Sequence, residues 1–165
     1  MGFGHTHRAA PNLRVQYWID AQGTEADPLS LSDLGAGYKL IFCFQHWCPS
    51  CHSFGFPALK KMVDSLSKNG IGLAVVQTVF EGAAHNGPER LREMQRQYDL
   101  ALPFGHDMPV NGERHPTIME DYRSGGTPWF ILIDPKGEII FSDFRLDPDK
   151  LIAAFEAGEA VQLTR

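Results

Sequence analysis

The chain has 165 residues, of which 43% are hydrophobic, and its formal net charge is −5. This length suits one folded unit with its own core, so we expect a single domain over residues 1–165. The acidic balance, with Lys and Arg mixed among the acids, argues against the basic face of a nucleic-acid-binding protein.

The first segments in chain order are an arm and two short strands. Residues 1–12 contain Gly, His, Ala and Pro without periodicity, so we expect a loose arm there. They lack the apolar stretch of a secretory signal, which favours a cytoplasmic location; removal of such a signal would instead imply a periplasmic or secreted protein. Residues 15–19 predict a first strand, and residues 29–31 alternate like a second.

The middle of the chain combines apolar strands with amphipathic helices. Residues 39–44 are a nearly continuous apolar run, typical of a strand buried on both faces of a sheet. Apolar residues at three- and four-residue spacing over 59–66 predict a helix, which Pro57 should kink or restart. Residues 71–80 predict a second buried strand, and no run of about 18 apolar residues predicts a membrane span.

The second half of the chain continues this alternation. It predicts a helix at 88–98, an edge segment at 102–104, a helix at 115–122, a strand at 129–133, a hairpin strand at 138–144 and a closing helix at 148–157. Strands that alternate with helices indicate an α/β fold with a partly parallel sheet, to which the terminal hairpin adds an antiparallel edge.

The motif Trp47-Cys48-Pro49-Ser50-Cys51 stands between a predicted strand and a predicted helix. Unpaired N–H groups and the positive end of the dipole at a helix start stabilise a thiolate, so we expect Cys48 to be an exposed nucleophile with a lowered pKa. Cys51 lies three residues on, within reach for a disulfide and pointing more toward the interior. Pro49 suits the first helical position, where no N–H is needed.

This element resembles the active site of thioredoxin-like proteins. Residues 29–34 and residues 126–137, which include Gly126-Thr127-Pro128-Trp129, make the chain similar to the TlpA/ResA-type branch, close to the peroxiredoxin-like group. The resemblance covers roughly residues 28–157. It implies a thioredoxin-like fold, with a central mixed sheet flanked by helices on both faces and an N-terminal β extension. It also implies a thiol–disulfide oxidoreductase without a cofactor, which we expect to be a monomer acting on disulfide-containing proteins or redox partners.

The resemblance assigns a second site segment at Thr127-Pro128, which matches the cis-proline of the family. The backbone before Pro128 would then face Cys48 and could pair with an extended substrate segment. Residues expected to bind or support the substrate are Trp47, Pro49, Ser50, Thr127 and Trp129.

Three positions depart from the family pattern. Phe42 stands where thioredoxins have a buried Asp, Phe54 stands where the ResA-type branch has a Glu, and Pro57 follows the second cysteine by six residues instead of five. The usual internal proton acceptor is therefore missing. The candidates to replace it are His46, His52, Glu81 and water.

Other readings of the motif remain open. Cys48 to His52 also satisfies the C-x-x-C-H pattern of haem attachment, and the two cysteines with His46 and His52 could carry copper or zinc. A structural disulfide is a further alternative. A peroxidase would have Pro and Thr where the chain has Ile41 and Gln45. Cys43, inside the apolar strand, should be a core residue. We favour the redox pair and expect no resident metal.

Overall fold

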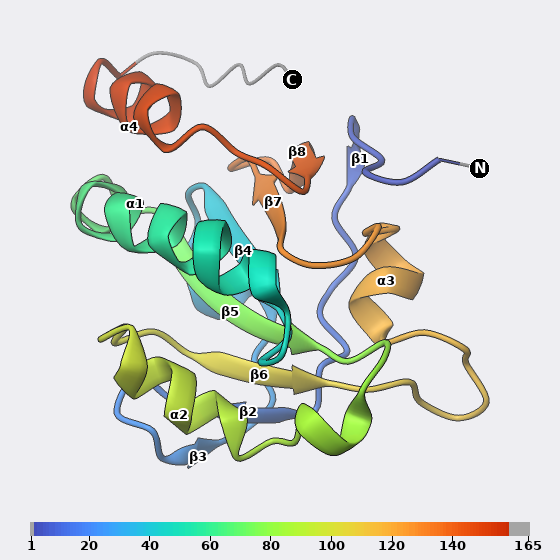
Figure 1. Ribbon diagram of the computed structural model, residues 1–165. Coiled ribbons are helices and arrows are strands. Elements are labelled where there is room, and N and C mark those ends of the chain that lie inside the picture. The colour runs from blue at the N-terminus through green and yellow to red at the C-terminus, as the bar shows by residue number, and fades with distance from the viewer. Residues whose placement is uncertain (1, 159–165) are drawn as a thin grey trace.

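The computed structural model describes residues 2–158, and its central feature is an eight-stranded mixed sheet (Figure 1). The strand order is β1-β8-β7-β4-β5-β6-β2-β3. The strands are β1 (Arg8–Ala9), β2 (Tyr17–Ile19), β3 (Glu25–Ala26), β4 (Lys39–Phe44), β5 (Gly72–Thr78), β6 (Phe104–Asp107), β7 (Trp129–Ile133) and β8 (Glu138–Asp143). The α-helices are α1 (Phe56–Lys68), α2 (Arg90–Gln97), α3 (Thr117–Tyr122) and α4 (Pro148–Glu156).

Strand β4 lies at the centre, and all six of its residues are buried. It pairs in parallel with β5 and antiparallel with β7. Strand β6 continues the parallel part, whereas β7 and β8 form the predicted antiparallel hairpin. The continuous apolar runs in β4, β5 and β7 follow from this central position, because both faces of the sheet are covered there.

Alternate residues of β4 face two separate cores. Phe42 and Phe44 pack with buried side chains of α1, α2 and α4 on one face. Ile41 and Cys43 pack on the other face with α3 and with residues 13–18 of the chain. Helices therefore cover both faces of the sheet, as predicted, and Cys43 is fully buried core.

The N-terminal part differs from the sequence prediction. Arg8–Ala9 forms β1, paired with β8, although it falls in the segment expected to be a loose arm. The edge of β8 offers unpaired backbone groups, which a neighbouring segment can satisfy. The prediction of a short strand at 29–31 is also wrong. The chain forms a 3₁₀ helix at Leu31–Leu34, because the Asp33 carboxylate accepts a hydrogen bond from the Ser30 N–H at 2.8 Å and favours a turn.

The helix after the cysteine motif changes its type just before Pro57, where the sequence predicts a kink or a restart. Helical backbone begins at Pro49, passes through a π-helical turn at Cys51–Gly55, and becomes α-helical at Phe56. Pro57 lies in the first turn of α1, where a missing N–H costs no helical hydrogen bond. The start of this helix points toward the loop that leads into β7 (Figure 1).

Candidate active site

The two cysteines of the motif lie directly beyond the carboxyl end of β4. The Cys48 N–H donates to the Gln45 carbonyl oxygen at 3.1 Å, and the Cys51 N–H lies 3.2 Å from the Cys48 Sγ. Cys48 immediately precedes the first helical residue, as predicted. Its expected exposure is wrong, because neighbouring loops leave it only 9% exposed and Cys51 completely buried. An incoming group can therefore approach the pair only through the surface above Cys48.

The loop before β7 brings the second predicted segment against the first. The Thr127–Pro128 peptide bond is cis, and the Thr127 carbonyl oxygen lies 3.6 Å from the Cys48 Sγ, close enough to accept a hydrogen bond from the thiol. Gly55 makes this approach possible. A Cβ atom at Gly55 would lie 2.8 Å from Phe42 Cζ and 2.9 Å from Pro128 Cβ, both closer than van der Waals contact.

The electrostatics of the pair separate the two thiols. A hydrogen bond from the Cys51 side chain lowers the pKa of Cys48 to about 6, against the cost of burial. The Thr127 side chain, the Cys51 N–H and the neighbouring His52 also lower this pKa. Burial is the main reason that the pKa of Cys51 is raised, and the adjacent Cys48 raises this pKa further. Near neutral pH, Cys48 is thus the thiolate and Cys51 the protonated thiol.

An aromatic cluster fills the place where related proteins have a buried acid. The Phe42 ring lies 5.0 Å from those of Phe56 and Phe130, between centroids. Phe54 also contacts Phe130, at 6.3 Å. This apolar environment raises the cost of ionising Cys51 and provides no group to accept its proton.

The three candidate proton acceptors occupy different environments. The His52 Nε2 hydrogen-bonds with the His46 carbonyl oxygen and its Nδ1 with the Tyr98 hydroxyl, so both ring nitrogens are engaged. The His46 Nδ1 is buried and has no hydrogen-bond partner among residues 2–158, and burial lowers the pKa of this ring. Glu81 is exposed on the same surface as Cys48. Within residues 2–158, none of the three is hydrogen-bonded to Cys51.

Three buried amide side chains hold the loop that carries the motif, and sequence reasoning missed them. The Gln77 Oε1 accepts from the His46 N–H at 3.1 Å, and the Asn86 Oδ1 accepts from the Trp47 N–H at 3.2 Å. The Gln45 Oε1 accepts from the N–H groups of residues 80 and 81 at 3.2 and 3.4 Å. The only signal in the sequence is the polar Gln77 within an otherwise apolar strand.

A groove of about 360 Å³ runs over Cys48. Its walls contain Trp47, Pro49, Ser50, Phe80, Glu81 and Thr127, so most of the predicted supporting residues meet there. The Trp47 ring is 50% exposed and stacks on His85, with centroids 5.9 Å apart. Trp129 does not line the groove: it is 1% exposed on β7, where its Nε1 donates to Ser142 Oγ at 2.9 Å. Its role is therefore packing.

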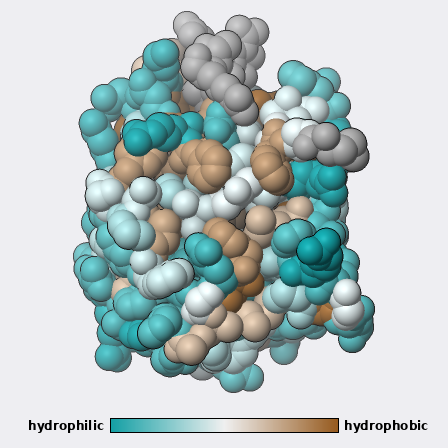
Figure 2. Space-filling model, turned by 45° about the vertical axis from the view of Figure 1, so that its right-hand side comes forward, coloured by the Kyte–Doolittle hydropathy of each residue, from teal (hydrophilic) through white to brown (hydrophobic). Residues whose placement is uncertain are grey.

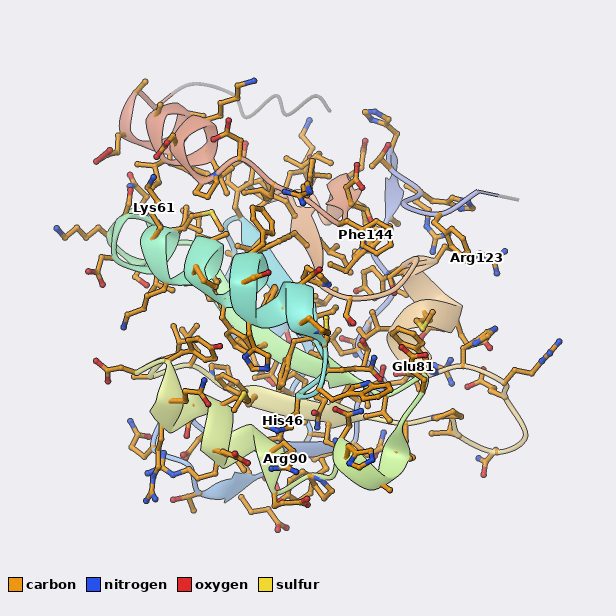
Figure 3. All side chains as sticks on the ribbon, in the orientation of Figure 1. His46, Lys61, Glu81, Arg90, Arg123 and Phe144 are labelled. Atoms are coloured by element: carbon orange, nitrogen blue, oxygen red, sulfur yellow. The ribbon has the colours of Figure 1, made fainter. Side chains whose placement is uncertain are left out.

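The surface around the groove is partly apolar. Figure 2 turns this end of the molecule forward and shows apolar groups gathered in patches among hydrophilic ones. Glu81 and Phe144 lie at the same end of the sheet as the start of the helix that follows Cys48 (Figure 3). Within residues 2–158, no cluster of three or more His, Cys, Asp or Glu side chains is arranged to hold a metal ion. No described helix is both long enough and apolar enough to cross a membrane.

This combination of fold and cysteine pair defines the class of thioredoxin-like proteins. A thioredoxin-like superfamily protein has a similar structure, with a TM-score of 0.78, 29% identity and coverage of 93% of this chain and 98% of its own. A thiol-disulfide isomerase from Corynebacterium glutamicum also has a similar structure, with a TM-score of 0.73 and 29% identity. The match covers 90% of this chain and 95% of the isomerase chain. The thioredoxin-like fold expected from the sequence is therefore confirmed.

Within this class the chain belongs to the AhpC/TSA family, which it matches over residues 6–142. It is also 26% identical, over 139 residues, to nucleoredoxin from Mus musculus and from Homo sapiens. The match covers 84% of this chain but 28% of each nucleoredoxin, so the chain spans under a third of these curated relatives. The narrower TlpA/ResA-type assignment stays a prediction.

Proposed function

We propose that this protein reduces disulfide bonds in other proteins, with Cys48 as the nucleophile and Cys51 as the resolving thiol. The observation that carries the proposal is the position of Cys48: its Sγ lies 3.6 Å from the Thr127 carbonyl oxygen, in a groove open to solvent. Its pKa of about 6 makes it a thiolate at neutral pH. Cys51, buried and protonated, is shielded from outside reagents until a mixed disulfide forms.

The reaction consists of two thiol–disulfide exchanges. The Cys48 thiolate attacks one sulfur of the substrate disulfide, and the other sulfur leaves as a thiolate that takes a proton from water. Cys51 then gives its proton to water and attacks the Cys48 Sγ, which releases the second substrate thiol and leaves a Cys48–Cys51 disulfide. Two electrons pass from the pair to the substrate, and an external dithiol returns the pair to its reduced form.

Water is our choice of proton acceptor for geometric reasons. Both nitrogens of His52 are already engaged, and Glu81 lies on the exposed side of the groove while Cys51 is fully buried. Within residues 2–158, His46 makes no hydrogen bond to Cys51 either. The groove over Cys48 gives water a route to the pair while the mixed disulfide is in place.

Single variants test the proposal in an insulin-reduction assay with dithiothreitol as the reductant. Cys48→Ser should abolish the activity above the background of dithiothreitol. In a separate reaction without dithiothreitol, pre-reduced Cys51→Ser should instead accumulate a mixed disulfide with the substrate, visible by mass spectrometry and released when excess thiol is added. Cys43→Ser is the matched control, since Cys43 is buried in the opposite core. Full activity in Cys48→Ser would overturn the assignment.

A thiol peroxidase is the second candidate, because the chain belongs to the AhpC/TSA family. The position of the expected peroxidase Thr is held by Gln45, whose side chain bonds the backbone of residues 80 and 81. We therefore expect hydrogen peroxide to oxidise Cys48 at the rate of an ordinary thiolate, without the acceleration that a peroxidase site provides. Rapid peroxide consumption that depends on Cys48 would make peroxidase the better assignment.

The direction of electron flow is testable separately. We propose a reductase of the cytoplasm, and equilibration of the Cys48–Cys51 pair with glutathione should then give a potential near that of thioredoxin, about −270 mV. A value near that of the oxidant DsbA, about −120 mV, would contradict both the direction and the compartment. The monomeric state expected from the sequence also remains a prediction.

A further inference from the structure

The groove over Cys48 continues past Pro128 into two further hollows. The first, of about 350 Å³, shares Ser50 and Thr127 with the Cys48 groove and adds Phe54 and Phe144. The second, of about 710 Å³, lies beyond it: Phe54, Phe144 and Pro148 form its apolar walls, and its charged rim consists of Asp143, Arg145, Asp147 and Lys150. Because each hollow shares residues with the next, a chain bound across Cys48 can place neighbouring side chains in them. We call these two hollows the Phe54–Phe144 pocket.

Both aromatic walls of this pocket pack against neighbouring side chains. Phe144 is 43% exposed, yet its ring packs edge-on against the buried Trp129, with centroids 4.6 Å apart. The Phe54 ring packs against Phe130, and the Arg145 guanidinium covers it at 4.8 Å from its centroid. Aromatic groups that are exposed but already ordered lose little conformational entropy on binding, which is why they act as anchors in protein interfaces.

Phe54 connects this pocket to the chemistry of the chain. It lies three residues after Cys51, in the same π-helical turn, and its ring lines the hollow that shares Ser50 and Thr127 with the Cys48 groove. An extended polypeptide advances about 3.3 Å per residue. A side chain one or two residues from a cysteine held at Cys48 therefore reaches the hollow just beyond Thr127 and Pro128.

We propose that the Phe54–Phe144 pocket binds a large apolar side chain located one or two residues from the reacting cysteine of a polypeptide substrate. This inference rests on the proposed function and narrows its substrate class. Polypeptide disulfides flanked by Phe, Leu or Met are preferred over small disulfides. Such a ligand buries apolar surface of both aromatic walls, and its main chain remains free to pair beside Thr127.

Peptides that carry a single cysteine as a mixed disulfide with 5-thio-2-nitrobenzoate test the proposal. The Cys48 thiolate attacks the peptide sulfur and the coloured nitrobenzoate thiolate leaves, so its absorbance reports the first step directly. The reduced protein is used in excess, in single turnover, without another reductant. The series has Phe at one of the two positions on either side of the cysteine, and an otherwise identical peptide has Ala at all four.

Wild-type protein should react roughly tenfold faster with the best Phe peptide than with the all-Ala peptide, as expected for burial of one aromatic side chain. In Phe144→Ser this ratio should fall to near one. Phe54→Ser, which removes the opposite wall, should do the same. Tyr17→Ser is the matched control: Tyr17 is a partly exposed aromatic on β2, far along the sheet from β8, and the ratio should stay near ten.

The outcomes separate this inference from the proposed function. A wild-type ratio near one, or a ratio near ten that survives both Phe144→Ser and Phe54→Ser, overturns the pocket proposal. The mixed disulfide of N-acetylcysteine amide has no flanking residues and tests Cys48 alone. If wild-type protein reacts with it no faster than Cys48→Ser does, the proposed function itself fails.

Discussion

The Cys48 Sγ lies 3.6 Å from the carbonyl oxygen of Thr127, although the two residues are 79 positions apart. The contact joins the carboxyl end of β4 to the loop before β7, two strands that are neighbours in the sheet. Only the protonated form of Cys48 donates a hydrogen to this oxygen. The thiolate present near neutral pH and the sulfur of a mixed disulfide have none to donate, so in both states the oxygen is available to a backbone N–H of the substrate.

The reaction rate of Cys48 should follow its pKa of about 6. Because only the thiolate reacts, the rate of alkylation by iodoacetamide should rise as the pH increases through about 6 and level off above about 7. A free thiol, with a pKa of about 8.5, would keep accelerating up to about pH 9. Rates measured from pH 4.5 to 9.5, with glutathione in parallel, distinguish the two. A midpoint above 8 would remove the electrostatic basis of the mechanism.

Only one of the three cysteines should be reactive in the folded protein. Cys43 and Cys51 are completely buried, and burial raises the pKa of both. Brief treatment of the reduced protein with iodoacetamide at pH 7 should therefore add a single label, which peptide mapping places on Cys48. In urea, all three should react. Labelling of Cys43 in the folded state would contradict its position in the core.

Gln77→Leu should destabilise the protein and disturb the motif together. The substitution keeps the volume but leaves the His46 N–H and the Gly87 carbonyl without their partner, a loss of about 1–3 kcal/mol in the free energy of unfolding. The loosened loop should also raise the midpoint of Cys48 alkylation. Urea unfolding and the pH profile measure the two effects. Exposed Gln22→Leu is the control and should change stability by less than about 0.5 kcal/mol.

Gly55→Ala tests the close packing between the helix and Pro128. Its Cβ would lie 2.8 Å from Phe42 Cζ and 2.9 Å from Pro128 Cβ, so one side must shift. Overpacking of this kind costs about 1–3 kcal/mol, and displacement of Pro128 should slow disulfide reduction as well. Ser53→Ala, an exposed change in the same π-helical turn, should leave both quantities unaltered. Equal stability of the two variants would show that this contact is not tight.

Much of the architecture could be predicted from the sequence because its local patterns agree with the fold. The apolar runs at 39–44 and 129–133 correspond to β4 and β7, and the hairpin follows from the turn between β7 and β8. The N-terminal segments were less predictable. Their conformation depends on partners far along the chain: β1 exists only because it pairs with the edge of β8.

The sequence by itself determined that two cysteines stand three residues apart at the start of a helix, and from this local spacing we predict a nucleophile and a resolving thiol. Only the tertiary structure decided how far each thiol is buried, which amides hold the loop, and that Trp129 packs inside while Phe144 lines the Phe54–Phe144 pocket. Burial and long-range hydrogen bonds depend on contacts between residues distant in the chain, and no local spacing encodes those contacts.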